Sequence, residues 1–379
     1  MKTLGVFAGG AIWFGAAISI AEIEAGRQMG GNWPALVGGH LFGGLLLFGA
    51  GLAGARTRCG AMESARQVFG SWGAKFFAAL NILQLVGWTA VMVAQGAEAV
   101  CALSGVEFWI CCVALAVMTA MWQYVGGGNA PKASAMCVGL MAVLCLMLSV
   151  KFRMAGTGGA APSDEMAFWS AFEISAAMPL SWLPLVADYT KDARRPVAVS
   201  AASATAYTMA SVWMFAMGFA LAGAGCEGFV GGVLRLGAKF GRVGLAVVVL
   251  STVTTTFLDA TSAGMSAGVF SRKFPPRTIG SAVCLLGAAL AVSGAMAHYM
   301  GFLYLVASVF APMAAVLLVD RFLAGRASGG VNFVAWLSGF LLYQFAGASP
   351  VGPTLTAMGV SALLTFVGKR VNGRFPLRA

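Results

Sequence analysis

Charged residues are scarce in this chain. Only 10% of its 379 residues are Asp, Glu, Lys or Arg, whereas 59% are hydrophobic. An ordinary soluble domain contains about 25% charged and about 45–50% apolar residues, because it has to cover its surface with groups that water solvates. The composition therefore excludes a soluble globular protein and predicts a chain that lies almost entirely within a lipid bilayer.

The motifs of common enzymes and of metal or disulfide sites are also missing. No GxSxG, HExxH or phosphate-loop pattern occurs, and the only two histidines, His40 and His298, are far apart in sequence. A packing role is the favoured interpretation for both. The eight cysteines lie in apolar runs without CxxC pairs, which favours packing over a disulfide framework. We therefore expect neither an enzyme nor an organic cofactor.

The chain consists instead of apolar runs separated by short polar gaps. A bilayer crossing needs about 20 apolar residues. Helices are the economical choice, because a lipid-facing backbone must satisfy its own hydrogen bonds and the alternating segments of a barrel are absent. The sequence predicts an all-α polytopic membrane protein with 12 transmembrane helices, over residues 4–26, 35–55, 76–103, 108–124, 134–151, 167–187, 197–225, 243–269, 279–296, 299–319, 331–347 and 352–368.

Basic residues are unevenly distributed between the two sides of these runs. The net charge is +11, but no basic stripe with interleaved aromatics occurs, so nucleic-acid binding is not expected. On the side that includes both chain ends lie 18 of the 24 Lys and Arg residues, and 6 lie on the other. The positive-inside rule then predicts an inner (cytoplasmic) membrane protein with both termini in the cytoplasm. We expect the first run to be retained as a span, since it shows no cleavage site.

Two runs are poor candidates for regular helices. The first is rich in small residues at its middle and carries Glu22, and the sixth contains Pro179 and Pro184. Because proline lacks an N–H and clashes with the preceding turn, we expect the sixth helix to unwind there. Interrupted spans at matching places in two halves are typical of inverted repeats with a binding site at the interruption. A pair of kinked packing helices is the alternative.

Few ionisable groups lie at membrane depth. Burying one costs roughly 2.5–3.5 kcal/mol on insertion scales, so each needs a compensating role. The acids are Glu22, Glu98, Glu173 and Asp259. The roles of Glu98 and Glu173 stay open.

The third run carries polar side chains on one helical face, namely Asn81, Gln84, Trp88 and Gln95. An indole can stack on a planar ring while an amide one turn away contacts the edge of that ring, which is typical of a heterocycle pocket. The alternative is a tryptophan in helix packing, with the amides bonded across the bundle.

The eighth run contains a dense group of hydroxyls followed by Asp259. These hydroxyls and unwound carbonyls of the first run would be oxygen ligands for a monovalent cation. The alternative is that the hydroxyls bond back to carbonyls of their own helix. The group comprises Ser251, Thr252, Thr254, Thr255 and Thr256.

Four stretches resemble the nucleobase-cation symporters (purine and cytosine permeases), and within them the CytX-type hydroxymethylpyrimidine transporters. They are residues 13–19 with 21–23, 61–64, 83–90 and 184–190. The resemblance implies a LeuT-like 5+5 inverted repeat over 1–325, with repeats over about 1–155 and 160–325, and two appended helices with a tail over 326–379. It further implies symport of one small heterocycle with Na+ or H+ by alternating access, with the lipid bilayer as surroundings and no obligatory protein partner.

Matching positions in these motifs imply roles for individual residues. Gln84 would contact the ring edge, Trp88 would stack on the ring, and Ser181 would add a polar contact. Pro179 stands where the family often has an aromatic that closes the other ring face, so Trp182 or Phe172 would have to replace it. The implied substrate contacts are Ser19, Glu22, Gln84, Trp88, Ser181, Trp182 and Asp259, and the implied cation ligands, for sodium, are Ala16, Ser19, Thr254 and Thr255.

Asp259 stands where relatives commonly carry asparagine. A carboxylate only accepts hydrogen bonds, so it suits a ligand edge made of donors, such as an exocyclic amine beside a protonatable ring nitrogen. The thiamine precursor 4-amino-5-hydroxymethyl-2-methylpyrimidine has such an edge, and Glu22 is a competing partner for it. We expect import of this hydroxymethylpyrimidine. Cytosine, another nucleobase or an allantoin-type substrate is the alternative, and an uncoupled channel or receptor is a further one.

Overall fold

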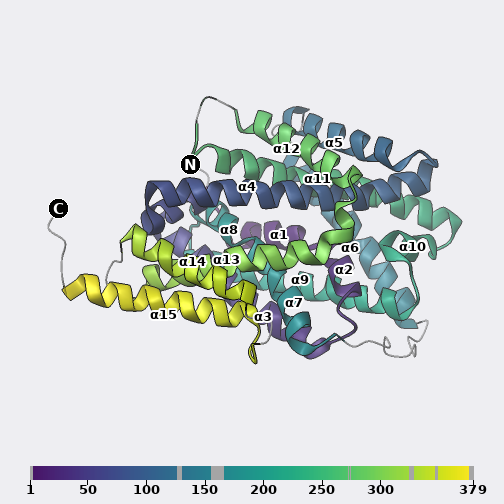
Figure 1. The fold of residues 1–379 in the computed structure, drawn as a ribbon. Helices are drawn as coiled ribbons and strands as arrows, with labels where there is room; N and C mark the ends of the chain where they lie inside the picture. Colours follow the sequence, from purple (N-terminus) through teal and green to yellow (C-terminus); the bar gives the residue numbers. More distant parts are fainter. Residues whose placement is uncertain are drawn as a thin grey trace.

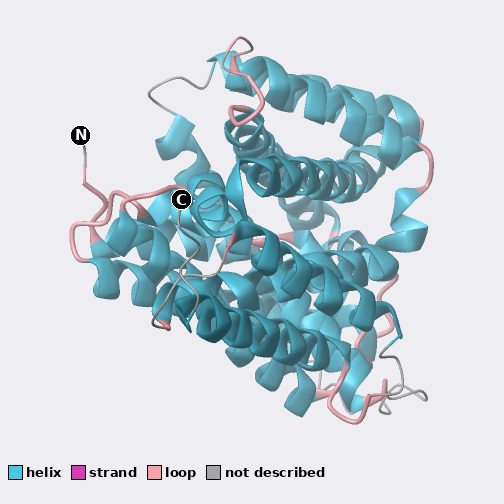
Figure 2. Cartoon of the chain, turned by 60° about the vertical axis from the view of Figure 1, so that its left-hand side comes forward, coloured by secondary structure: helices cyan, strands magenta, loops and turns pink. Residues whose placement is uncertain are grey.

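The computed structural model describes residues 3–125, 130–154, 166–271, 273, 275–323, 328–345 and 349–374. Within these ranges all regular structure is helical, apart from one isolated bridge between Leu4 and Ala193 (Figures 1 and 2). The all-α class predicted from composition is confirmed for this part of the chain.

Each predicted apolar run coincides with one helix or with a pair of helices. The first run holds α1 (Val6–Ala17) and α2 (Ile20–Arg27), and the sixth holds α7 (Phe168–Ser181) and α8 (Leu183–Thr190). The other runs hold α3 (Trp33–Thr57), α4 (Ala61–Ser104), α5 (Phe108–Val125), α6 (Ala130–Met154), α9 (Pro196–Gly223), α11 (Ala238–Ala267), α12 (Pro276–Val292), α13 (Tyr299–Phe322), α14 (Gly329–Phe345) and α15 (Pro353–Arg374). Of two short elements, α10 (Gly228–Leu234) lies between runs, and η2 (Ala295–His298) overlaps the end of the ninth run.

Eight of the described helices are long and apolar enough to cross a bilayer, counting α7 and α8 as one, and nine if the bent pair α1–α2 is also one span. The chain is thus a multi-pass membrane protein. The helices α12 and α14 have 17 residues each, so the full count of twelve crossings remains a prediction. The division into two repeats and the side of the membrane on which the termini lie also remain predictions.

Helix α4 is longer than its apolar run because it contains two helical segments. Gly70 lies between them with φ 77° and ψ 179°, a left-handed conformation that side chains with a Cβ rarely adopt. The segment before Gly70 precedes the predicted span, and the segment after it carries the polar face with Asn81, Gln84 and Trp88. The kink at Gly70 therefore separates the first segment of α4, which precedes the predicted span, from the segment that contains it.

Glycine residues allow two helix pairs, α2 with α9 and α3 with α7, to pack closely. A side chain at Gly26 or Gly218 would collide with the backbone of the partner helix, so α2 and α9 pack backbone against backbone. On α3, Gly39 and Gly43 leave room for Ser175 and Pro179 of α7. Figure 1 shows α1 near the centre of the view, with α14 and α15 at its edge. The broken first span is thus surrounded by the bundle.

Candidate functional site

The first span is broken at its middle. Between α1 and α2 the backbone of Ile18 (φ −77°, ψ 79°) and Ser19 (φ −140°, ψ 155°) leaves the helical region, and the two helices are bent by 52°. The Ser19 N–H donates to the Ala17 carbonyl at 2.9 Å, and the Ser19 hydroxyl accepts from the Glu22 N–H at 3.4 Å. The predicted interruption is confirmed. It presents the carbonyl end of α1 and the N–H end of α2 at one place.

The sixth span is far less interrupted than the sequence predicts. Its helix is broken only at Trp182 (φ −89°, ψ −9°), and residues 168–190 otherwise form one span. Pro184 occupies the first turn of α8, where no intrahelical N–H bond is needed. The ring of Pro179 fits where α3 has Gly43. The predicted interruption is therefore confirmed in its place, between the two prolines, but it is confined to Trp182 and no longer stretch is unwound.

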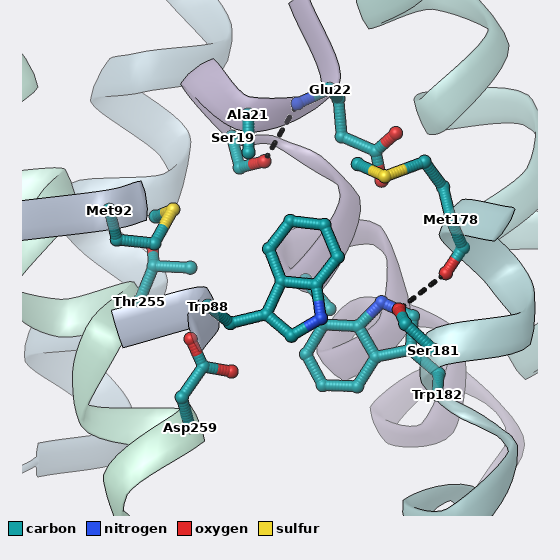
Figure 3. Close-up of a pocket in the computed structure, with 11 residues that line it drawn as sticks. Ser19, Ala21, Glu22, Trp88, Met92, Met178, Ser181, Trp182, Thr255 and Asp259 are labelled. Carbon is teal, nitrogen blue, oxygen red and sulfur yellow. Dashed lines mark hydrogen bonds between the residues drawn. The ribbon is translucent and has the colours of Figure 1, made fainter. Parts of the chain in front are cut away.

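A small cavity lies between the break in the first span, α4, the α7–α8 junction and α11 (Figure 3). It holds about 30 Å³, which is room for no more than a few water molecules. Of the ten side chains named from the sequence, eight line it, and Gln84 and Thr254 do not. The eight are Ala16, Ser19, Glu22, Trp88, Ser181, Trp182, Thr255 and Asp259. The structure thus brings most of the predicted residues together, and their binding roles remain predictions.

Two indoles face this cavity from different helices. Trp88 is 8% exposed and packs edge-on against Phe302, with ring centroids 5.1 Å apart. Its Nε1–H has no partner within the described residues. Trp182, by contrast, donates through Nε1 to the Tyr207 hydroxyl at 3.1 Å and packs edge-on against Trp13. Trp88 therefore keeps a free donor at the cavity, while Trp182 is fixed by α1 and α9.

Gln84 lies behind the cavity wall. Its amide nitrogen donates to the Asn81 side chain at 2.8 Å and to the Ser181 carbonyl at 2.9 Å. The Ser181 hydroxyl in turn donates to the Met178 carbonyl at 2.6 Å (Figure 3). Gln84 thereby joins α4 to the α7–α8 junction, and its buried Oε1 has no partner among the described residues. Because the amide nitrogen is already bonded, the predicted contact of Gln84 with the edge of a substrate ring would have to use Oε1.

Asp259 presents an unpaired carboxylate to the cavity from α11. The residue is 5% exposed and lies near Trp88 (Figure 3). No hydrogen bond or ion pair to this carboxylate occurs within the part of the chain that the structure describes. A buried carboxylate without a partner is costly in a membrane protein, so its position at a cavity points to a ligand.

The hydroxyls of α11 bond within their own helix. Thr254 donates to the Ser251 carbonyl at 3.0 Å and Thr255 donates to the same carbonyl at 2.8 Å. This is the back-bonding alternative considered from the sequence. The bonds use the hydroxyl protons and leave oxygen lone pairs available, so they are compatible with a cation beside Thr255.

Glu22 lines the cavity but is held by hydroxyls of α9. Its two carboxylate oxygens accept from Tyr207 at 2.7 Å and from Ser211 at 2.6 Å. Ser211 also lies 2.6 Å from Nε2 of His40. The sequence interpretation treated His40 as a packing residue and missed Tyr207 and Ser211. The spacing of four residues between these two hydroxyls was the available signal, since it places them on one helical face.

The two remaining membrane acids lie away from this cavity. Glu173 on α7 accepts from the Tyr343 hydroxyl at 3.1 Å, the Thr354 N–H at 2.9 Å and the Thr354 hydroxyl. It thus connects α7 to α14 and to the start of α15. Glu98 is exposed near the end of α4. Neither lines the cavity.

Comparison with solved structures identifies relatives of this fold. The inward-facing structure of Mhp1 matches with a TM-score of 0.79 and 19% identity over 100% of this chain and 93% of that one. A second structure of Mhp1, described as a nucleobase-cation-symport-1 family transporter, is in a closed conformation with bromovinylhydantoin bound. It matches with a TM-score of 0.78 and 19% identity over 100% of this chain and 95% of that one. The chain shares the fold of Mhp1.

A second transporter has the same fold at lower identity. A Na+-coupled sialic acid symporter, in its substrate-bound outward-open state, matches with a TM-score of 0.70 and 11% identity over 99% of this chain and 90% of that one. No family model and no curated protein sequence matches the chain. The LeuT-like fold implied by the sequence resemblance is supported by these structures, whereas the substrate and the coupling ion belong to a proposal.

Proposed function

We propose that this chain is a secondary transporter that imports a planar aminopyrimidine together with Na+ or H+. The proposal depends above all on one observation, the unpaired carboxylate of Asp259 in the same cavity as the indole of Trp88. A flat apolar ring can stack on the indole, while the donors of an aminopyrimidine edge bind the carboxylate. Hydroxymethylpyrimidine is the substrate that we favour, and cytosine, which has a similar edge, is the runner-up.

The place of the cavity supports transport rather than simple binding. It lies at the break in the first span, where two helix ends present their backbone dipoles, an arrangement typical of transporters with discontinuous helices. A space of about 30 Å³ is too small for a pyrimidine, so the surrounding helices have to move apart before a substrate enters. The shared fold with Mhp1, whose structure holds the heterocycle bromovinylhydantoin, favours the same class of ligand.

Oxygen atoms suited to a sodium ion lie beside the same break. Ala16, Ser19 and Thr255 line the cavity and carry uncharged carbonyl and hydroxyl oxygens, and Thr254 is adjacent on α11. Uncharged oxygens of this kind suit a hard monovalent cation. A cation and a substrate that share one cavity are coupled when each favours the same conformation.

Uptake into proteoliposomes tests the proposal. Purified protein should accumulate radiolabelled hydroxymethylpyrimidine, and collapsing the sodium and proton gradients one at a time should identify the coupling ion. Excess unlabelled hydroxymethylpyrimidine should compete fully, and uracil, which lacks the exocyclic amine, should compete weakly. Stronger competition by cytosine would favour the runner-up. Uptake that continues unchanged with both gradients collapsed would contradict coupled transport and favour a channel.

The role of Asp259 is tested by Asp259→Asn. The amide replaces two acceptor oxygens by one acceptor and one donor, so affinity for hydroxymethylpyrimidine should fall about tenfold, which corresponds to about 1.4 kcal/mol. Affinity for uracil should fall less. The matched control is Asp192→Asn, in the loop after α8. If the ratio of the affinities for hydroxymethylpyrimidine and uracil is the same in Asp259→Asn as in the wild-type chain, the Asp259 carboxylate does not contact the substrate.

A further inference from the structure

A chain of hydrogen bonds leads from the cavity into the packed helices behind it. Glu22 lines the cavity, and its Oε2 lies 2.6 Å from the Ser211 hydroxyl. Ser211 lies 2.6 Å from Nε2 of His40, and Nδ1 of His40 lies 2.6 Å from the Ser175 hydroxyl and 3.1 Å from the Leu36 carbonyl. The four side chains are at most 1% exposed. They come from α2, α9, α3 and α7, so the chain joins four helices.

The donors and acceptors of this chain determine where protons can lie. Ser211 has a single proton, which it can give either to Glu22 or to His40. When Glu22 is a carboxylate, Ser211 donates to it and His40 must donate from Nε2. When Glu22 is protonated on Oε2, it can donate to Ser211, which then donates to Nε2 of His40. Both arrangements leave every atom between the carboxylate and the imidazole with a partner.

The groups around Glu22 supply no fixed positive charge to it. Tyr207 of α9 donates to its Oε1, and Tyr299 of α13 donates to the neighbouring Ala21 carbonyl at 2.9 Å. Glu24 of α2 is paired with Arg27 at 3.1 Å. Asp259 of α11 faces the same cavity. Helix α4 contributes the neutral Trp88 to the cavity, and the acid Glu98 of α4 is exposed near the end of that helix.

His40 is likewise without a charged neighbour. The elements packed on it present the Ser175 hydroxyl from α7, and the Ser211 hydroxyl and the ring of Phe215 from α9. In the described part of the chain, no Lys or Arg pairs with Glu22 or with His40. A proton is therefore the cation that this buried carboxylate and imidazole can share.

We propose that Glu22, Ser211 and His40 form a proton-binding site that opens on the substrate cavity. One proton is held jointly: it leaves Oε2 of Glu22 for the Ser211 oxygen while the original Ser211 proton moves to Nε2 of His40. One O–H bond of the carboxyl group breaks and one N–H bond forms, which gives a carboxylate and an imidazolium, and the reverse shift restores the neutral pair. No other reactant is needed.

A second branch of the network links this proton to the cavity wall. Oε1 of Glu22 accepts from Tyr207, whose oxygen accepts from Nε1 of Trp182. A ring that displaces the Trp182 indole would therefore disturb the donors of Glu22. This part of the inference rests on the proposed transport function and makes the shared proton a coupling ion.

Nitrogen NMR of His40 tests the proton site without any substrate. The variant His298→Gln leaves His40 as the single histidine, so a chain labelled with 15N-histidine in lipid nanodiscs reports on it alone. In both protonated arrangements Nδ1 carries a proton. The Ser175 hydroxyl donates to the Leu36 carbonyl at 2.7 Å, so Nδ1 of His40 keeps its proton and the shared proton lies on the Nε2 side of the ring. Raising the pH should therefore change the Nε2 signal in one step, because the shared proton leaves Nε2, Ser211 and Glu22.

Variants decide whether Glu22 controls that step. Adding Glu22→Gln or Ser211→Ala should remove it or shift it by at least one pH unit, and the control Glu98→Gln, an exposed acid on α4, should leave it unchanged. An Nε2 signal that does not change between pH 4 and 10, or one that titrates identically with Glu22→Gln, would overturn the proposal. Because no substrate is present, this outcome is independent of the proposed transport.

Coupling is tested in proteoliposomes that contain a pH-sensitive dye. Hydroxymethylpyrimidine added outside should acidify the lumen with the wild-type chain, and His40→Gln, which lies behind the cavity wall, should abolish acidification while exchange of labelled for unlabelled substrate persists. Uptake by the wild-type chain without acidification would overturn coupling through this site. Absence of any uptake would instead contradict the proposed function, and the NMR step would still decide the proton site.

Discussion

Glu22 and Glu173 are two buried glutamates that differ in what their neighbours can do. Each is 1% exposed and each accepts from hydroxyls of other helices. The donors of Glu173 come from α14 and α15, end there, and lie away from the cavity. The donors of Glu22 continue to His40 on one side and to Trp182 on the other. Burial alone therefore does not separate an acid that only joins helices from one whose hydrogen bonds connect to the cavity.

The largest expected effect comes from removing the structural acid. In Glu173→Leu the Tyr343 hydroxyl and the Thr354 N–H lose their acceptor inside the bundle, so the free energy of unfolding should fall by about 3 kcal/mol. Thermal unfolding of the purified protein in detergent measures this. Glu107→Leu, at an exposed position before α5, is the control and should have little effect. Equal stability of the two variants would show that Glu173 does not hold α14 and α15 to α7.

Glu22→Gln should sharpen the contrast by changing coupling rather than stability. Gln keeps the size of the side chain and an acceptor oxygen but cannot bind the shared proton. Wild-type uptake should be faster at an external pH of 6 than at 8, because a higher proton concentration populates the protonated pair, and Glu22→Gln should remove this difference. Glu173→Gln should retain it. A pH difference that is lost in Glu173→Gln as well would break the comparison.

The smallest expected effect is that of Tyr207→Phe. It removes one hydrogen bond to Glu22 and the acceptor of Trp182, and each such bond contributes about 0.5–1.5 kcal/mol. Initial uptake should fall about threefold, with the protein still folded. Tyr124→Phe, at an exposed position of α5, is the matched control. Equal uptake rates for the two variants would show that this branch of the network has no role.

Much of the fold could be predicted from the sequence because a bilayer leaves few choices. Apolar runs have to become helices, and each predicted run coincides with a helix or helix pair. The break in the first span was also predictable, from small residues beside an acid. The place of the break in the sixth span, between Pro179 and Pro184, was predictable too. Its confinement to Trp182 was not, because the fit of Pro179 depends on Gly43 of α3, a contact between distant parts of the chain.

The candidate site was predicted only in part, for the same reason. Motif positions indicated Trp88 and Asp259, and Trp182 was one of two candidates to replace a missing aromatic; the structure places all three at one cavity. Gln84 turns instead to Asn81 and Ser181 once α4 meets α7. His40 becomes part of a polar network only because α2, α3 and α9 converge. No local pattern in the second run shows that convergence.

Equilibrium binding to Trp88→Ala tests the account most directly. Binding of radiolabelled hydroxymethylpyrimidine to the purified protein should weaken about tenfold or more, because the variant loses the stacking surface at the cavity. Trp109→Ala, which removes a 55% exposed indole from α5, should bind as the wild-type chain does. Equal affinity of Trp88→Ala and the wild-type chain would contradict a substrate site at the break in the first span.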